Sequence, residues 1–335
     1  MAWIKKILYS LAALVIFLIW AVFLLTVYGF YKNPPSADLQ FGVNFSKKQA
    51  LRFNLDWRKT YLEILDDLNV KFVRLAAYWD EIEPEEGNYN FSDLDWQIEE
   101  ARKRNAKIIL AVGLRLPRWP ECHAPQWARI QNEELRIKNL IRYIEETVKH
   151  YQEFNNIVAW QVENEPFLRG FGECPALNVK LLGKEIALVK SLDSRPIVIT
   201  DSGELGDWFR SYRRADIFGT TMYRKVWSDK ISGFFRYPLP PAFFWWRQGT
   251  VNFFLGRKEI IGVELQAEAW GPGRQIYDMR PDEIKDFFSA AEMLESIDYS
   301  RRVGLPINYL WGAEWWAWMK ENGHPQYWNL AKTVF

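Results

Sequence analysis

Histidine and cysteine are scarce in this sequence, which has three histidines and two cysteines among 335 residues. The histidines form no His-x-His pair and no His-Glu-x-x-His motif, so the usual ligand patterns of a zinc hydrolase are missing. The glycine-rich motifs of phosphate-binding loops and dinucleotide-binding folds are also missing, as is the Gly-x-Ser-x-Gly motif of serine hydrolases. These absences exclude several large classes of enzyme.

Neither sign of charge is in excess, because 43 Lys and Arg residues face 42 Asp and Glu residues. A nucleic-acid-binding protein usually carries a basic surplus that neutralises phosphates, so we expect no nucleic-acid partner. Aromatic residues are abundant instead, with 18 Trp, 15 Tyr and 22 Phe. Aromatic rings fill protein cores, and they also offer flat apolar faces suited to pyranose rings. The composition therefore favours a carbohydrate as the partner.

Residues 7–31 contain no charged side chain and consist mostly of large apolar residues. As a helix, this run would extend over roughly 37 Å, enough to cross a hydrocarbon core of about 30 Å. Lys5 and Lys6 precede the run and Lys32 follows it, and this distribution favours a cytoplasmic N-terminus. A cleaved signal peptide is the alternative, although the run is long for one and no Ala-x-Ala site follows. We expect a single-pass membrane anchor with the rest of the chain on the extracytoplasmic side.

After this segment, short apolar runs alternate with amphipathic stretches, a pattern typical of parallel β/α folds. Eight runs predict strands: Phe41–Asn44, Lys71–Leu75, Lys107–Val112, Ile157–Val162, Pro196–Thr200, Ile217–Met222, Glu259–Val263 and Ile307–Leu310. They predict a (β/α)8 TIM barrel, whose active site lies at the C-terminal ends of the strands. The expected organisation is an anchor over 1–31, a linker over 32–38 and a catalytic barrel over 39–335. The aromatic-rich stretch 226–256 has no clean period, so we interpret it as an elaborated loop after the sixth strand.

Two of the predicted strands lead into glutamates. The fourth continues into Asn164, Glu165 and a proline, and the seventh is followed by Glu264 and, four residues later, Glu268. Two carboxyl groups that face each other across the mouth of a barrel are the catalytic pair that glycoside hydrolysis requires. One carboxyl protonates the leaving oxygen, and the other attacks the anomeric carbon.

The motif Trp160-x-x-x-Asn164-Glu165-Pro166 resembles the acid/base signature of glycoside hydrolase clan A, the retaining (β/α)8 glycosidases. The segment 79–95, which reads WDEIEPEEGNYNFSDLD, is similar to a motif of the family 42 β-galactosidase branch and its relatives, including family 5-like enzymes. The similarity covers about residues 39–330. It implies a retaining glycoside hydrolase that acts on a β-linked oligo- or polysaccharide and needs no cofactor or metal. With the anchor predicted from the apolar run, this enzyme would be membrane-anchored.

The resemblance also implies roles for individual residues. Glu165 would be the general acid/base and Glu264 the nucleophile, and Asn164 would bind the 2-hydroxyl of the sugar that is attacked. Tyr223 would donate a hydrogen bond to the nucleophile, and the charge of Arg74 would keep that carboxylate ionised. A core tyrosine and a structural ion pair remain the alternatives for the last two residues.

Other residues at the ends of the predicted strands are candidates for substrate binding. Trp311, at the end of the eighth strand, would form a platform under the sugar, with Trp315 as the second choice and core packing as the alternative. Trp119 and His123 follow the third strand, where substrate contact and structural capping are both open. Glu268 is the alternative nucleophile, and it would otherwise contact substrate or brace Arg74.

Three functions remain open on these residues: a hydrolase, a transglycosylase with the same two glutamates, and a carbohydrate-binding barrel without activity. The two intact strand-end glutamates argue against the last. The sequence also leaves open whether Cys122 and Cys174, which follow neighbouring strands, form a disulfide or remain free thiols.

Overall fold

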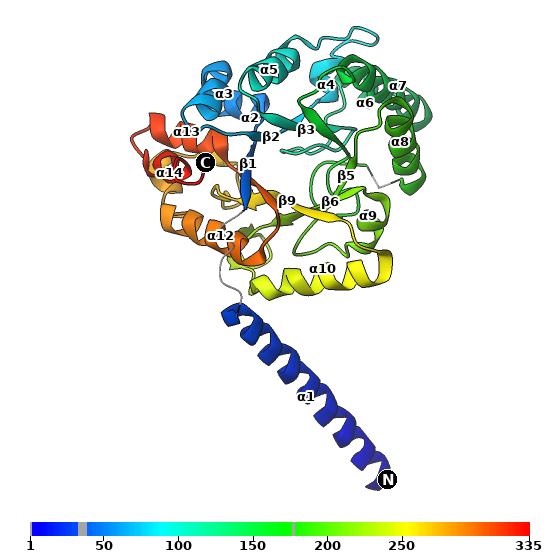
Figure 1. Cartoon of the computed structure of the whole chain (residues 1–335), viewed down its shortest axis with the longest axis vertical. Coiled ribbons are helices and arrows are strands. Elements are labelled where there is room, and N and C mark those ends of the chain that lie inside the picture. The colour runs from blue at the N-terminus through cyan, green and yellow to red at the C-terminus, as the bar shows by residue number, and fades with distance from the viewer. Residues whose placement is uncertain (1, 33–38, 176–177) are drawn as a thin grey trace.

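The computed structural model describes residues 2–32, 39–175 and 178–335, without the side chains at 2, 4, 22 and 25–32. Within these residues, eight parallel strands close into a barrel in the order β1-β10-β9-β6-β5-β4-β3-β2 (Figure 1). The strands are β1 Gln40–Asn44, β2 Phe72–Ala76, β3 Lys107–Val112, β4 Ile157–Val162, β5 Ile197–Asp201, β6 Ile217–Met222, β9 Glu259–Gln266 and β10 Ile307–Trp311. The predicted (β/α)8 barrel is confirmed.

Helices surround the barrel and connect successive strands (Figure 1). They are α2 Lys47–Arg52, α3 Trp57–Asp66, α4 Trp79–Ile82, α5 Ser92–Lys103, α6 Gln126–Arg129, α7 Glu133–Tyr151, α8 Val179–Leu192, α9 Phe209–Arg214, α10 Pro241–Leu255, α11 Pro281–Ile284, α12 Ala290–Val303, α13 Ala313–Glu321 and α14 Gln326–Ala331, with a 3-10 turn at Ile276–Asp278. The longest of them is α7, where the side chain of Asn132 accepts a hydrogen bond from the backbone N–H of Leu135 and caps the helix. Its apolar stripe is buried against the barrel: Leu140, Tyr143, Ile144, Val148 and Tyr151.

Strand β9 carries a bulge that decides where Glu264 points. Gly262 pairs with Thr220 of β6, but the next β6 residue, Thr221, pairs with Glu264, so Val263 is an extra residue. The pairing of β9 with β10 shifts by one residue over the same segment. A bulge re-aims the side chains that follow it. The sequence predicts Glu264 as the first residue after the strand, but it lies within β9, where it pairs with Thr221 of β6.

The sequence predicts a loop for the aromatic-rich stretch 226–256, but the stretch contains regular secondary structure. It contains a hairpin of β7 (Lys225–Ser228) and β8 (Gly233–Arg236), followed by the four-turn helix α10. Phe244 and Val251 of α10 are buried, whereas Trp246, Phe253 and Phe254 are exposed. Because large apolar residues lie on all sides of α10, its sequence has no amphipathic period from which the helix could be predicted.

The N-terminal helix α1 (Ala2–Lys32) extends away from the barrel, and its C-terminal end lies near α10 (Figure 1). In the part of the chain that the structure describes, no helix is both long and apolar enough to cross a membrane. The structure therefore gives the predicted anchor no support. Apart from Lys32, the predicted linker lies outside the described residues.

Candidate active site

Arg74 of β2 lies at the centre of a buried network at the C-terminal ends of the strands. Its Nη1 donates to Oε1 of Glu264 at 2.9 Å and to Oδ1 of Asn44 at 2.8 Å. Its Nη2 donates to Oδ1 of Asn164 at 2.7 Å, and its Nε donates to Oε1 of Gln161 at 2.7 Å. Because the donors of a guanidinium point in fixed directions, Arg74 sets the positions of side chains from β1, β4 and β9 relative to one another.

Glu264 accepts hydrogen bonds on both of its carboxylate oxygens. Arg74 donates to Oε1, and the Tyr223 hydroxyl, directly after β6, donates to Oε2 at 2.9 Å. Burial, followed by the negative charges of Glu264 and Glu268, raises the pKa of Tyr223 well above its ordinary value, so the phenol keeps the proton that it donates. The contacts implied between Arg74, Tyr223 and Glu264 are therefore present. Glu264 is an anchored, buried acceptor, as an attacking carboxylate must be.

Glu165 lies on the turn after β4 with a backbone φ of 41°, a conformation that non-glycine residues seldom adopt outside functional sites. Its N–H donates to the hydroxyl of Thr200, and its Oε1 accepts a long hydrogen bond from Thr221. Burial raises the pKa of Glu165 well above its ordinary value, and the negative charges of Glu264 and Glu121 raise it further. A carboxyl group whose pKa is raised by burial and neighbouring negative charges is suited to act as a general acid.

The orientation of the Asn164 side-chain amide follows from the groups that donate hydrogen bonds to it. Its Oδ1 accepts from Arg74, and also from Gln161 and Thr200 at 3.3 Å each, so the amide nitrogen must point the other way. Asn164 Nδ2 donates to Oε2 of Glu121 at 3.2 Å. Glu121 was not among the candidates from sequence. It is a third carboxylate beside Glu165 and Glu264.

Glu268 is also at the site, but it pairs with Arg118 and not with Arg74, which was one of its expected partners. Arg118 Nη1 lies 2.6 Å from Oε1 of Glu268, and Nη2 lies 2.7 Å from Oε2 of Glu314. The guanidinium carbon of Arg118 lies 4.0 Å from the ring centroid of Trp311. The predicted platform tryptophan is thus at the end of β10 as expected, with a cation over its ring.

Trp315 and His123, for which both substrate contact and a structural role were open, are packed as structural residues. Trp315 is fully buried on α13, and its ring packs 4.4 Å from that of Tyr327, so its prediction as a cleft residue was wrong. His123 is also buried, with Nε2 3.1 Å from the carbonyl oxygen of Arg118. Burial, with the charge of Lys48, lowers the pKa of His123 to about 3. The imidazole is therefore neutral, and it braces the loop after β3 instead of facing substrate.

Half-buried aromatic rings form a rim that leads away from Tyr223. The ring of Trp270 lies 5.5 Å from that of Tyr223, Phe171 lies 6.0 Å from Trp270, and Trp119 lies 6.1 Å from Phe171. We refer to Trp119, Phe171 and Trp270 as the aromatic rim. Sequence reasoning placed Trp119 at the mouth but missed the other two. The available signal was that each follows a barrel strand.

The loops after β3 and β4 are joined covalently. Cys122 and Cys174 form a disulfide with a Cα–Cα distance of 5.3 Å, which decides between the two alternatives that the sequence left open. The backbone N–H of Glu173 also donates to the carbonyl of Pro120. These links hold Arg118 and Glu121 over the barrel mouth.

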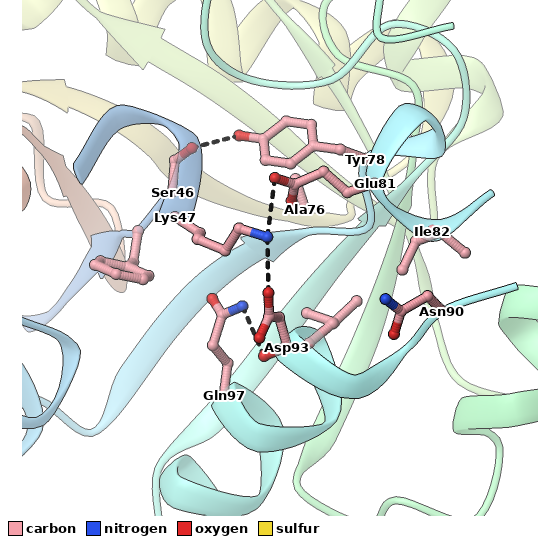
Figure 2. Close-up of a pocket in the computed structure, with 11 residues that line it drawn as sticks. Ser46, Lys47, Ala76, Tyr78, Glu81, Ile82, Asn90, Asp93 and Gln97 are labelled. Carbon is pink, nitrogen blue, oxygen red and sulfur yellow. Dashed lines mark hydrogen bonds and ion pairs between the residues drawn. The ribbon is translucent and has the colours of Figure 1, made fainter. Parts of the chain in front are cut away.

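A small pocket lies beside this site, between the loops after β1 and β2 and the first turn of α5 (Figure 2). Lys47 Nζ lies 3.1 Å from Oε1 of Glu81 and 2.9 Å from Oδ2 of Asp93, and Tyr78 donates to the hydroxyl of Ser46 (Figure 2). The lysine is therefore neutralised by two carboxylates of the protein itself. We assign this pocket no catalytic role.

The chain is similar to known glycoside hydrolases. Residues 53–136 match the family model of glycoside hydrolase family 42, described as β-galactosidase. The β-galactosidase BgaA of Clostridium cellulovorans is 28% identical over 127 residues, which are 32% of this chain and 19% of that protein. The β-galactosidase LacZ of Lactobacillus acidophilus is 26% identical over 116 residues, 30% of this chain and 17% of that protein. The chain therefore aligns with less than a fifth of the length of these relatives.

Solved structures match over most of the chain. Xylanase 10B of Thermotoga petrophila, determined with xylobiose, has a TM-score of 0.54 and 17% identity, and 82% of each chain is covered. A GH5_18 protein of Streptomyces cattleya, determined with GlcNAc, has a TM-score of 0.55 and 13% identity, covering 82% of this chain and 70% of that one. The resemblance to glycoside hydrolase clan A is confirmed. The prediction of a glycosidase agrees with these matches, and the structural ones support the barrel fold.

Proposed function

We propose that this protein is a retaining glycoside hydrolase that cleaves a β-linked oligo- or polysaccharide by double displacement. One observation carries the proposal: two carboxyl groups of the same site have opposite environments. Glu264 is bound by the Arg74 guanidinium and the Tyr223 hydroxyl, whereas Glu165 is buried near other carboxylates that raise its pKa. Such a difference assigns the base and the acid of a carboxylate pair.

In the first step, Glu264 attacks the anomeric carbon while Glu165 gives its proton to the departing glycosidic oxygen. This forms a glycosyl ester on Glu264 and releases the leaving group as an alcohol. In the second step, Glu165 takes a proton from water, and the water oxygen displaces Glu264 from the anomeric carbon. Two inversions at one carbon restore the β configuration. Arg74 and Tyr223 position the nucleophile throughout.

The aromatic rim favours an oligosaccharide as the substrate, in preference to a small glycoside. Trp119, Phe171 and Trp270 lie in sequence along the loops after β3, β4 and β9, and all three are half-buried. Ring faces of this kind suit the C–H faces of successive sugars. The same rim could hold a sugar acceptor in place of water, so transglycosylation is the second candidate.

The test is turnover by the full chain on a panel of aryl β-glycosides and β-linked polysaccharides. We expect hydrolysis with β-anomeric product appearing first by NMR, and loss of turnover in Glu165→Gln on substrates with poor leaving groups. Turnover in Glu165→Gln equal to wild type would contradict the assignment of the acid. Product analysis with added acceptor sugars separates a hydrolase from a transglycosylase.

We propose separately that residues 7–31 anchor the chain in a membrane with the barrel outside. This proposal is supported by the sequence alone, through the uncharged apolar run and the lysines before it. The test is fractionation of expressing cells followed by carbonate extraction, with protease added to intact cells. Release of the chain by carbonate, or protection of the barrel from protease, would contradict it.

A further inference from the structure

The loop that carries Glu121 is held unusually firmly. It lies between Arg118 and Cys122, and both Arg118 and Glu121 have positive φ angles, 82° and 72°. The backbone N–H of Glu121 donates to the Arg118 carbonyl, and Leu116 donates to the carbonyl of Glu121. The neighbouring disulfide ties the loop to the segment after β4. Strained residues persist only where surrounding contacts hold them, and they gather at functional sites.

Gly172 shows how closely the second loop packs behind Glu121. A Cβ atom built on Gly172 would lie 2.7 Å from the Cβ of Glu121, so only glycine fits there. The Glu121 side chain is therefore backed by protein on one side. On the other side its carboxylate meets Asn164 Nδ2. The carboxylate is thereby directed at the catalytic centre.

Glu121 is a buried carboxylate with an incomplete set of hydrogen bonds. It forms an ion pair with Arg115, whose Nε lies 3.6 Å from Glu121 Oε2, beyond hydrogen-bond length. Burial raises the pKa of Glu121 to about 7; the charge of Arg115 opposes this shift, and the charge of Glu264 adds to it. A carboxylate has about four acceptor positions, and the Asn164 amide uses one of them. The carboxylate can therefore accept a further hydrogen bond from a ligand.

The position of Glu121 relative to the nucleophile limits what this ligand group can be. Glu264 Oε1 faces Arg74, which also binds Asn164, whereas Oε2 faces Tyr223. A pyranose attacked at its anomeric carbon has the ring oxygen on one side of that carbon and the 2-hydroxyl on the other. A ring oxygen has no proton to donate to a carboxylate. A hydroxyl can accept from the Asn164 amide and donate to Glu121 at the same time.

We propose that Glu121 is a substrate-binding residue of this site: it accepts a hydrogen bond from the same 2-hydroxyl that the clan A resemblance already assigns to Asn164, and it thereby selects sugars in which this hydroxyl is free. This proposal rests on the proposed glycosidase function and names its substrate class: neutral β-glycosides that are unsubstituted at the 2-position. A sugar without the 2-hydroxyl leaves Asn164 Nδ2 bound to Glu121 as before, but it gives the carboxylate no further donor in a buried site, and an unsatisfied buried acceptor discriminates strongly against such a ligand.

The experiment compares wild type with Glu121→Gln on matched aryl β-glycosides that carry hydroxyl, hydrogen, amino or acetamido at the 2-position. We expect Glu121→Gln to lower kcat/KM for the 2-hydroxy substrate about 10- to 100-fold, the range for a hydrogen bond to a charged group. The 2-deoxy substrate should lose less than about threefold, because the lost contact does not exist in its complex. Wild type should prefer the 2-hydroxy substrate over all the others.

Glu173→Gln is the matched control, because Glu173 is in the disulfide-linked segment after β4 and its side chain is exposed. It should leave every kcat/KM within about twofold of wild type, in keeping with the small effects of most surface substitutions. A melting curve confirms that each variant is folded. If Glu121→Gln is unfolded, Glu121→Asp replaces it, since the shorter side chain withdraws the carboxylate from the site without removing its charge.

Equal losses on the 2-hydroxy and 2-deoxy substrates would reduce Glu121 to a structural residue and overturn the proposal. Better turnover of the 2-amino substrate by wild type would mean that the carboxylate binds an ammonium group, which also overturns it. If wild type turns over no substrate, the proposed function fails. In that case, calorimetric titration of the 2-hydroxy and 2-deoxy sugars into wild type and into Glu121→Gln tests the role of Glu121 in binding alone. If both proteins bind the 2-hydroxy sugar with equal affinity, the role of Glu121 is rejected.

Discussion

Arg74 and Glu264 form an ion pair of 2.9 Å in which both side chains are almost completely buried. Removing two charges from water is expensive, so a pair in this position is retained for what it positions and is weak evidence for stability. Here the guanidinium also binds Asn44, Gln161 and Asn164. The arrangement fixes the carboxylate of Glu264 in one place, which an attacking group requires.

Replacing Arg74 by methionine should abolish turnover and lower stability by about 3–5 kcal/mol, because it leaves a buried carboxylate without its cation. Denaturant unfolding and kcat/KM on an aryl β-glycoside measure the two effects. Arg58→Met is the control, since Arg58 pairs with Asp93 at the surface, where such pairs contribute about 1 kcal/mol or less. Full activity in Arg74→Met would contradict its role in positioning Glu264.

Glu264, and not Glu268, should carry the covalent intermediate. Glu264→Gln should lose turnover by at least about 1,000-fold, because no other group can form the ester, and a 2-fluoro glycoside should label the Glu264 peptide. Glu268→Gln weakens the ion pair with Arg118 and should retain measurable turnover. Label on the Glu268 peptide, located by peptide mass, would reverse the assignment.

Much of this site was accessible from the sequence because it lies on strands. Arg74 and Glu264 lie in apolar runs of the barrel and Glu165 follows one, and every predicted strand bound came within three residues of the structure, with three strands matched at both ends. The loop residues were not accessible, because tertiary contacts place them. Glu121 reaches the site through a disulfide and a glycine contact that no local pattern encodes. Trp315 differs from Trp311 only by lying four residues further on, where the chain has turned into α13 and points the ring into the core.

Stability should fall as pH rises from about 5 to 8. The pKa values of Glu121, Glu163 and Glu204 are each raised to about 7 in the folded protein, chiefly by burial. Between the ordinary value near 4.5 and 7, these three groups make the folded state bind more protons than the unfolded state, so raising the pH favours unfolding. His123, whose pKa is lowered from 6.5 to about 3, acts in the opposite direction below 6.5, but it is one group against three. Melting temperatures across this range test it. Glu204→Gln should flatten the slope, and a melting temperature that rises with pH would contradict the prediction.

Removing the disulfide should reduce activity as well as stability. In the Cys122→Ser, Cys174→Ser double variant the loops after β3 and β4 lose their covalent link, and loss of a native disulfide typically lowers stability by about 2–5 kcal/mol in small domains. The loop that holds Glu121 then samples more positions, so kcat/KM should fall at temperatures where the barrel is still folded. Unchanged kcat/KM at such temperatures would show that the link stabilises the fold without shaping the site.

The aromatic rim should bind the parts of a substrate that are remote from the bond being cleaved. Phe171→Ala should raise KM for a β-linked tetrasaccharide about three- to tenfold, in keeping with the energy of one aromatic contact, and leave kcat on a monosaccharide aryl glycoside within about twofold. Trp315→Ala gives the contrasting result, because its ring packs against Tyr327 in the core. It should lower stability by about 3–5 kcal/mol and leave the KM ratio between the two substrates unchanged. A Phe171→Ala variant with an unchanged KM ratio would remove the rim from substrate binding.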